Sequence, residues 1–140
     1  MLRQSLSQIE IQTRGRGFYE LTGEAQSLLE ASRLKEGTLT LHVQHTSASL
    51  LIQENADPEV RRDLERFFAR LVPDGDALFR HVEEGEDDMP SHVRCALTAV
   101  NLVVPFARGR LTLGTWQGIY LWEHRHRAHR RVIVTHLPGE

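Results

Sequence analysis

The stretch TLTLHVQH, residues Thr38–His45, gives the clearest indication of the fold because apolar and polar residues alternate along it. A period of two places successive side chains on opposite faces of a β-strand. One face carries Leu39, Leu41, Val43 and His45, and the other carries Thr40, His42 and Gln44. The pattern therefore predicts a strand with one buried face, and it places an imidazole at the end of that face.

Working outward, the sequence predicts more strands and about three helices. The expected strands are 5–13, 48–53, 102–106, 110–115, 119–123 and 131–136, with a turn at 14–17 and a long acidic loop at 73–90. Pro105 suggests that its strand lies at an edge or a bulge. This element order predicts a single α+β domain over residues 1–140, with an antiparallel or mixed, sandwich-like sheet packed against the helices.

Capping residues and apolar spacing locate the three helices. The first is expected at 23–34, with Thr22 as its cap and Gly37 as its terminator. The second begins at Asp57-Pro58 and should turn an apolar stripe inward, made of Val60, Leu64, Phe67, Phe68 and Leu71. The third is expected from Ser91 to about Val100, and its buried residues would be Val93, Leu97 and Val100.

Composition excludes several classes of protein. The formal net charge is −2, so no overall basic field favours nucleic acid. Cys95 is the only cysteine, which rules out an internal disulfide and fits a reducing cytoplasm; the thiol reads as a small buried side chain. No apolar run approaches the roughly 20 residues of a membrane-spanning helix, and no signal peptide is visible. We therefore expect a cytoplasmic protein without nucleic-acid or membrane partners.

Three stretches carry the residues that could perform chemistry: HTSAS at 45–49, EGEDDMPSH at 84–92 and GTWQGIYLWEHR at 114–125. His45, His81 and His92 form a plausible set of metal ligands with open positions for a substrate, although their spacing alone is a weak signal. His45 could equally be a core histidine, and His92 an exposed residue of the first helical turn. If the three stretches converge, they build a polar pocket for a metal ion, an anion or both.

Carboxylates and small polar residues flank the same stretches. Most of the acidic run at 83–88 reads as a solvated loop, but Asp87 or Asp88 could orient a ligand histidine, bind Mg²⁺ or act as a general base. Asn55 could line the site, and Thr115 between two glycines could help to hold an anion, although a simple bulge explains that stretch nearly as well. The segment EHRHRAHRR at 123–131 could bind phosphate or form a solvated turn.

These stretches together resemble the YjbQ family, also called the secondary thiamine-phosphate synthase family. The strongest marks are QHTSASLLIQEN followed by Asp57, His81 with EGEDDMPSH, and GTWQGIYLWEHR. The resemblance implies a compact α+β domain that assembles as a homotrimer, with a metal ion held near the subunit interfaces. By the same resemblance, His45, His81 and His92 would hold the metal. The pocket would be completed by the acidic residues Glu54, Asp87 and Glu123, taken as catalytic, and by Asn55, Thr115, Gln117 and Arg125, taken as contacts to the anionic substrate.

The leading functional hypothesis is a small metal-dependent enzyme that acts on an anionic or phosphorylated small molecule, with thiamine-phosphate synthase as the named candidate. A metal-dependent hydrolase and a non-enzymatic module that binds a metal or a ligand are the alternatives. Imidazole ligands suit Zn²⁺, whereas carboxylates and a pyrophosphate product suit Mg²⁺ or Mn²⁺, so both metals stay open at this point.

Overall fold

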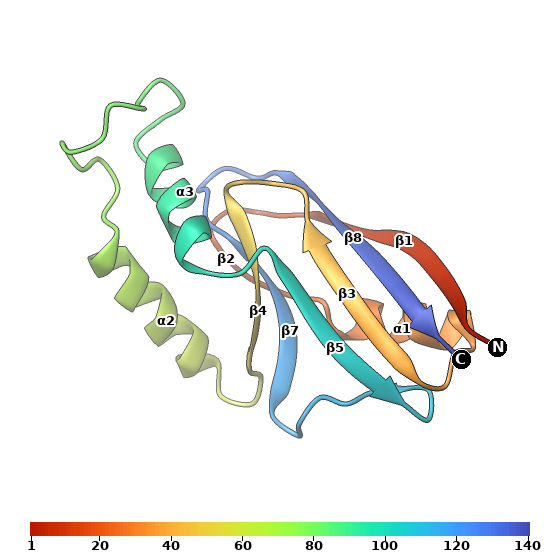
Figure 1. Cartoon of the computed structure of the whole chain (residues 1–140). Helices are drawn as coiled ribbons and strands as arrows, with labels where there is room; N and C mark the ends of the chain where they lie inside the picture. Colours follow the sequence, from red (N-terminus) through yellow and green to blue (C-terminus); the bar gives the residue numbers. More distant parts are fainter.

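The computed structural model describes residues 1–140 and contains eight strands and three helices, which confirms the predicted α+β class. The helices are α1 (Thr22–Ser32), α2 (Pro58–Leu71) and α3 (Asp88–Leu97). The strands are β1 (Arg3–Gln12), β2 (Gly17–Glu20), β3 (Gly37–Val43), β4 (Ala48–Glu54), β5 (Asn101–Ala107), β6 (Arg110–Leu111), β7 (Gln117–Glu123) and β8 (Arg130–Gly139). They form two antiparallel sheets, in the orders β1-β8-β3-β5-β6 and β2-β7-β4 (Figure 1).

The alternating strand lies at the centre of the larger sheet, as its pattern predicts. β3 pairs with β8 on one side and with β5 on the other, and Leu39 and Leu41 are fully buried. The strand ends at Val43, so His45 falls in the connection to β4 rather than on the strand itself. The outer neighbour of β5, the strand that contains Pro105, is only the short β6.

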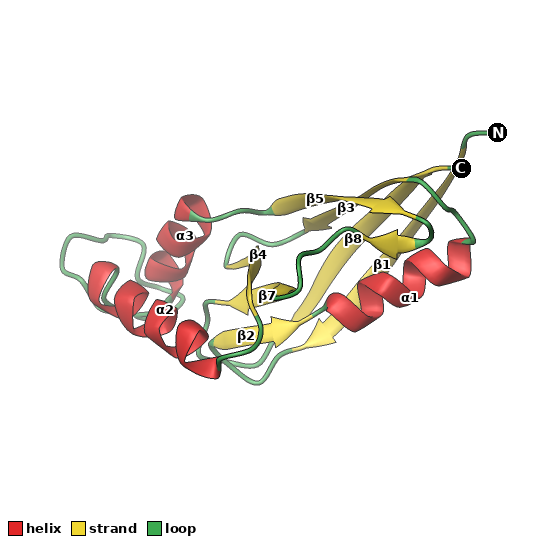
Figure 2. Ribbon diagram, turned by 90° about the horizontal axis from the view of Figure 1, so that it is seen from below, coloured by secondary structure: helices red, strands yellow, loops and turns green.

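In the smaller sheet, β7 is the central strand and is buried from Gly118 to Glu123. Apolar residues of both sheets and of α1 form one core, which includes Leu29, Leu41, Leu121 and Ile133. The helices lie at two ends of the molecule: α1 lies beside the larger sheet, whereas α2 and α3 lie together beyond the smaller one (Figures 1 and 2). None of the three helices has the length and apolar character that crossing a membrane requires.

Several local predictions were wrong for identifiable reasons. The turn predicted at 14–17 is present as a bend at 15–16, whereas β2, which begins at Gly17, was not predicted, because a four-residue edge strand is too short for a periodic pattern. Thr22 does not cap α1; its hydroxyl donates to Glu20 and accepts the N–H of Ile119. That helix ends at Ser32, five residues before Gly37, which instead begins β3. The strand expected at 110–115 is reduced to Arg110–Leu111.

The apolar stripe of α2 is less buried than predicted. Asp57 does cap the helix, accepting the N–H of Glu59 at 2.9 Å. Phe67 and Leu71, however, are 49% and 54% exposed, and Leu97 on α3 is 58% exposed instead of buried. A single chain therefore leaves apolar surface uncovered on both helices at this end of the molecule.

Candidate metal centre

The first turn of α3 brings two of the functional side chains together. The helix begins at Asp88, three residues earlier than predicted, since proline is tolerated in the first turn of a helix and Pro90 therefore does not delay the start. Asp88 and His92 are consequently four residues apart on one helix and share a face. This pair has the helical i, i+4 spacing, which no two of the three predicted histidine ligands have.

His81, from the loop before α3, completes a cluster around Asp88. Its Nε2 lies 2.7 Å from Asp88 Oδ2, and the Nε2 of His92 lies 3.1 Å from the same oxygen. One ligand atom from each of His81, Asp88 and His92 lies within 4.8 Å of the others. Two imidazoles and a carboxylate are a common donor set for a transition-metal ion.

Asp88 is buried and ionised. Its Oδ1 accepts a hydrogen bond from Arg125 Nη1 at 2.7 Å. Burial by itself raises the pKa of Asp88, but the hydrogen bond to His81 and the charges of His92 and Arg125 outweigh it, so the pKa lies below its ordinary value. A carboxylate with a lowered pKa is available as a ligand at neutral pH.

The contacts of His92 require a positive charge beside its Nε2. Its Nδ1 lies 2.7 Å from the carbonyl oxygen of Thr46, an acceptor, so Nδ1 must carry a proton. A neutral ring would then turn the lone pair of Nε2 toward the ionised Asp88 at 3.1 Å. Either a second proton or a cation must lie between these two atoms. A carbonyl that fixes the tautomer in this way is the usual support of a metal-ligating histidine.

The separations of the donors fit a small cation after a modest adjustment. Ligand atoms about 2.1 Å from a tetrahedral ion lie roughly 3.4 Å apart, which is about 0.3 Å more than the His92–Asp88 distance of 3.1 Å and about 0.7 Å more than the His81–Asp88 distance of 2.7 Å. Three protein ligands leave at least one position open for a substrate oxygen. His81, Asp88 and His92 therefore fit a catalytic metal site better than a closed structural one.

Within one chain His45 does not join this cluster, so the single chain does not assemble the three predicted histidines. Its Nε2 accepts the backbone N–H of Val132 at 3.0 Å, so neither ring nitrogen of the neutral form is free to coordinate a metal. Burial lowers the pKa of His45, and the charge of Arg131 lowers it further, although Glu123 acts in the opposite direction. Within one chain His45 is thus a neutral, half-buried residue that supports β8.

Glu123, predicted to be catalytic, is instead a buried structural carboxylate. It is fully buried and forms an ion pair with Arg131, with Nε of the guanidinium 2.8 Å from Oε1. The hydroxyl of Thr13 donates to it at 2.8 Å, and the backbone N–H of Arg125 at 3.2 Å. Its oxygens are occupied by these partners, and it is not a member of the His81–Asp88–His92 cluster.

Asp87 and Arg125 lie beside the cluster but bind each other. Arg125 donates through Nε to Asp87 at 3.1 Å, through Nη1 to Asp88 and through Nη2 to the carbonyl of Glu84 at 2.9 Å. Burial raises the pKa of Asp87, but the N–H of His126 and the charge of Arg125 outweigh it, so the pKa is lowered. Asp87 is therefore a weak base, and Arg125 fixes the two carboxylates rather than offering an empty site to an anion.

The remaining predicted residues, Glu54, Asn55, Thr115 and Gln117, lie at the other end of the smaller sheet. Ala48 pairs with Glu123 at the end near the cluster, whereas Glu54 pairs with Gln117 at the far end. Six residues of strand separate these ends by about 20 Å. Gln117 closes the turn before β7 by accepting the N–H of Gly114 at 2.8 Å. One chain therefore does not bring these residues to the metal cluster.

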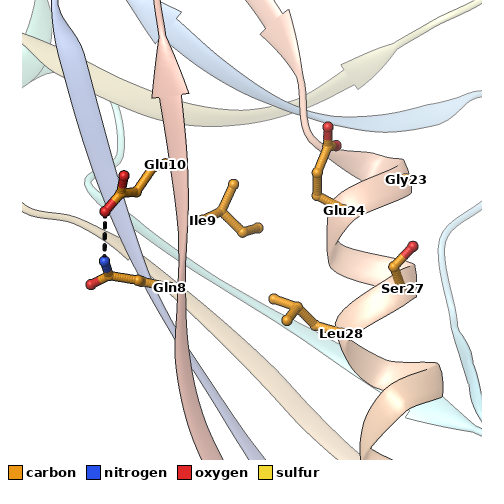
Figure 3. Close-up of a pocket in the computed structure, with 7 residues that line it drawn as sticks. All are labelled: Gln8, Ile9, Glu10, Gly23, Glu24, Ser27 and Leu28. Carbon is orange, nitrogen blue, oxygen red and sulfur yellow. Dashed lines mark hydrogen bonds between the residues drawn. The ribbon is translucent and has the colours of Figure 1, made fainter.

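A polar hollow with a volume of about 700 Å³ is lined in part by Arg125, which contacts Asp88 of the cluster, and none of the residues that line it is apolar. A second hollow, of about 590 Å³, lies between β1 and α1 and contains none of the predicted site residues (Figure 3). Only the first is next to the cluster, and it is large enough for a small metabolite. Its lining residues are Glu83, Glu84, Gly85, Asp87, Arg125, His126, Arg127 and His129.

The sequence reasoning also missed a buried histidine beside the cluster. His124 is fully buried, and its Nε2 lies 2.8 Å from the hydroxyl of Ser49. Its backbone carbonyl accepts the hydroxyl of Ser91 at 2.8 Å, which fixes the first turn of α3 against the end of β7. Three His-Arg pairs lie close together at 124–130, and their spacing does not indicate which imidazole is structural.

The fold and the cluster define a small α+β protein with a candidate His–Asp–His metal centre. The family model described as "UPF0047 protein YjbQ-like" matches residues 7–139. The chain belongs to this family, which confirms the resemblance seen in the sequence.

Individual relatives agree with this membership. A UPF0047 protein of Synechocystis sp. is 49% identical over 99% of this chain and 94% of its own length, and the YjbQ protein of Escherichia coli O157:H7 is 48% identical over 94% and 96%. A crystal structure of a YjbQ/UPF0047 protein from Clostridium acetobutylicum superposes with a TM-score of 0.86 at 27% identity, over 94% of this chain and 98% of that one. These names specify a family and a fold, and no reaction.

Proposed function

We propose that this protein is a metal-dependent enzyme for an anionic, phosphorylated small molecule, and that His81, Asp88 and His92 hold its divalent cation. The observation that carries the proposal is the convergence of two imidazole Nε2 atoms on one oxygen of a buried, ionised carboxylate. Because the carbonyl of Thr46 fixes the tautomer of His92, the lone pair of Nε2 is directed at that same point.

The charges around the cluster support an anionic substrate. Asp87 and Asp88 carry two negative charges, and the guanidinium of Arg125 already neutralises part of them. A divalent cation bound by neutral imidazoles would therefore leave the cluster with an excess of positive charge. An anionic oxygen in the open coordination position would balance that excess, and the polar hollow beside Arg125 offers room for the rest of the molecule.

The donor set favours Zn²⁺ or a similar transition metal over Mg²⁺. Imidazole nitrogen suits Zn²⁺, whereas Mg²⁺ prefers carboxylates, phosphates and water. Two of the three donors here are imidazoles. Mn²⁺ accepts both types of ligand, and metal replacement can rank the three ions directly.

Thiamine-phosphate synthase is the candidate reaction. It joins a pyrimidine diphosphate to a thiazole phosphate and releases pyrophosphate. When bound, the cation would neutralise charge that develops on the departing phosphate oxygens. Arg125 would keep Asp87 and Asp88 ionised and in place, and Arg127, exposed in the adjoining hollow, would contact the phosphates. A hydrolase would use the same centre with water as the second reactant.

Metal analysis and product analysis on the same preparation test this proposal. Purified protein should contain a stoichiometric transition metal, and removing the metal should abolish both thiamine-phosphate formation and pyrophosphate release. His92→Gln should lose metal and turnover, whereas His136→Gln, whose ring contacts Gln4 on the larger sheet, should keep both. Phosphate release without the thiazole half would favour the hydrolase. Retention of full activity by His92→Gln would contradict a metal centre at this position.

We also propose that the protein acts as a homotrimer, as its resemblance implies. The apolar surface of Phe67, Leu71 and Leu97 supports burial against another copy. Assembly could also bring Gln117 and its neighbours, about 20 Å from the cluster within one chain, to the centre of an adjacent copy. Light scattering should give three times the chain mass, and the double variant Phe67→Asp, Leu71→Asp should give a smaller species. A monomeric wild-type protein would contradict trimer assembly.

A further inference from the structure

The loop that supplies His81 has few contacts of its own with the rest of the protein. Residues 75–86 connect the segment after α2 to α3, and the side chain of His81 is 49% exposed, with Asp88 as its hydrogen-bond partner. The two ends of the loop meet where Gly75 donates to the carbonyl of Glu86 at 3.1 Å. Within the loop, Arg125 also donates to the carbonyl of Glu84 at 2.9 Å, so the position of His81 depends on that contact and on what holds the two ends.

His126 contacts the chain on both sides of the loop. Its ring Nε2 lies 2.8 Å from Asp74 Oδ2, directly before the loop. Its backbone N–H donates to Asp87 Oδ2 at 2.9 Å, directly after the loop. One residue of the connection between β7 and β8 thus joins the two ends, through two different atoms.

Arg16 connects Asp74, at the start of the loop, to the backbone at the end of β7. Its guanidinium binds Asp74 through two parallel hydrogen bonds of 3.0 Å each, and its Nε donates to the carbonyl of His124 at 2.7 Å. Its side chain is only 10% exposed. Burial raises the pKa of Asp74, but Arg16 and His126 outweigh it and lower the pKa, so the carboxylate stays ionised at neutral pH. Paired hydrogen bonds to a buried guanidinium fix both position and orientation.

We propose that Arg16, Asp74 and His126 are positioning residues that hold the loop 75–86 so that His81 faces Asp88 and His92 before a cation binds. The inference deepens the proposed function and rests on it for its purpose. A loop that had to be ordered during binding would cost conformational free energy and weaken the site. Outer supports of metal ligands typically contribute about 10- to 100-fold in affinity.

Two variants and one control isolate this chain of contacts. Asp74→Asn weakens the bonds to Arg16 and His126, and His126→Ala removes the ring but keeps the backbone N–H that binds Asp87. His129→Ala is the matched control, because His129 lies in the same connection and lines the same hollow, and its ring nitrogen contacts the carbonyl of Arg127. Each protein is titrated with Co²⁺, whose visible absorption reports its ligands.

We expect Asp74→Asn and His126→Ala to bind Co²⁺ about 10- to 100-fold more weakly than the wild type, with the same absorption per bound ion. His129→Ala should bind within about twofold of the wild type. The unchanged spectrum separates a positioning residue from a ligand, because His81→Gln should change it. Unchanged affinity in both variants would overturn the inference.

Amide hydrogen exchange in the metal-free proteins gives the second measurement. The N–H group of Gly75 donates between the two ends of the loop, and those of Phe79 and Gly85 donate within it. Exchange at these three amides should accelerate at least about tenfold in both variants and not in His129→Ala. Unchanged exchange would overturn the inference even if the metal affinity fell. If the wild type takes up no Co²⁺, the proposed function fails, and exchange alone then decides whether these three residues hold the loop.

Discussion

Asp88→Asn is the substitution that most directly separates the structural role of the cluster from its proposed role as a metal site. The side chain keeps its shape and loses its charge. The carboxylate accepts a hydrogen bond from Arg125 at 2.7 Å and faces two imidazole nitrogens at 2.7 and 3.1 Å. An amide can still accept from Arg125 through its oxygen, but its NH₂ group is not a ligand for a cation.

The expected loss of stability is moderate. A hydrogen bond to a charged group contributes about 1.5–3 kcal/mol, and Arg125 keeps Asp87 and the carbonyl of Glu84 as partners, so we expect a loss near the lower end. About 2 kcal/mol corresponds to a Tm decrease of roughly 5–8 °C for a chain of this size. The metal affinity should fall by more than about 100-fold, because a ligand contributes more than an outer support does.

The effect should depend on pH in a defined direction. Because the pKa of Asp88 is lowered in the folded protein, its stabilising contribution is present above the ordinary carboxyl value and is lost as the pH falls through the folded value. Urea denaturation should therefore show the largest gap between wild type and Asp88→Asn at neutral pH, and a smaller gap below roughly pH 4. Asp76→Asn is the control, since that carboxylate accepts only a local N–H from Leu78. An equal gap at both pH values, or unchanged Co²⁺ affinity, would refute this reasoning.

Three further predictions test the structure around the centre. Burial, reinforced by nearby arginines, lowers the pKa of His124 to about 2. The NMR signals of His124 should therefore stay constant from about pH 4 to 9, and the stability of the protein should decrease as the pH falls below the ordinary histidine value of about 6.5. An NMR titration midpoint near 6.5 for His124 would contradict this. Glu123→Gln breaks a buried ion pair and should cost roughly 3–5 kcal/mol in urea denaturation, whereas a loss below about 1 kcal/mol would argue for a functional rather than a structural carboxylate. Gly37→Ala would place a Cβ 2.1 Å from the carbonyl oxygen of Pro138 and should destabilise by about 3 kcal/mol or more, while Gly23→Ala, with no atom within 4 Å, should be neutral or stabilising; similar Tm values for the two would be inconsistent with this packing.

The parts of the fold that the sequence predicts well are those set by local chemistry. The alternation around Leu41 identifies β3, and Asp57-Pro58 marks the start of α2, because each signal depends only on neighbouring residues. The stripe on α2 was read as buried because periodicity shows which face is apolar but not what covers it. Phe67 and Leu71 are half exposed within one chain for that reason.

The candidate site was predicted in part. The single chain brings His81 and His92 together around Asp88, which the sequence offered as one of several acidic candidates, and His45 lies apart from them. The close pairing of Asp88 with His92 was not foreseen, because a helix that began at Ser91 would leave Asp88 outside it. The contacts of Arg125 were also beyond local reasoning, because they join residues nearly forty positions apart in the sequence.

The HTSAS stretch shows why a motif can mark a site without supplying its ligands. The carbonyl of Thr46 fixes the tautomer of His92, the hydroxyl of Ser47 lies 2.9 Å from Arg131, and the hydroxyl of Ser49 lies 2.8 Å from His124. The first contact orients a residue of the cluster and the third a residue beside it, whereas Ser47 holds the arginine that pairs with Glu123. Small hydroxyl residues suit this task because they reach a backbone or an imidazole over a short distance and lose little side-chain entropy. The motif therefore builds the support of the centre, and the same physical reasoning explains why its histidine is bound to Val132 instead of a metal.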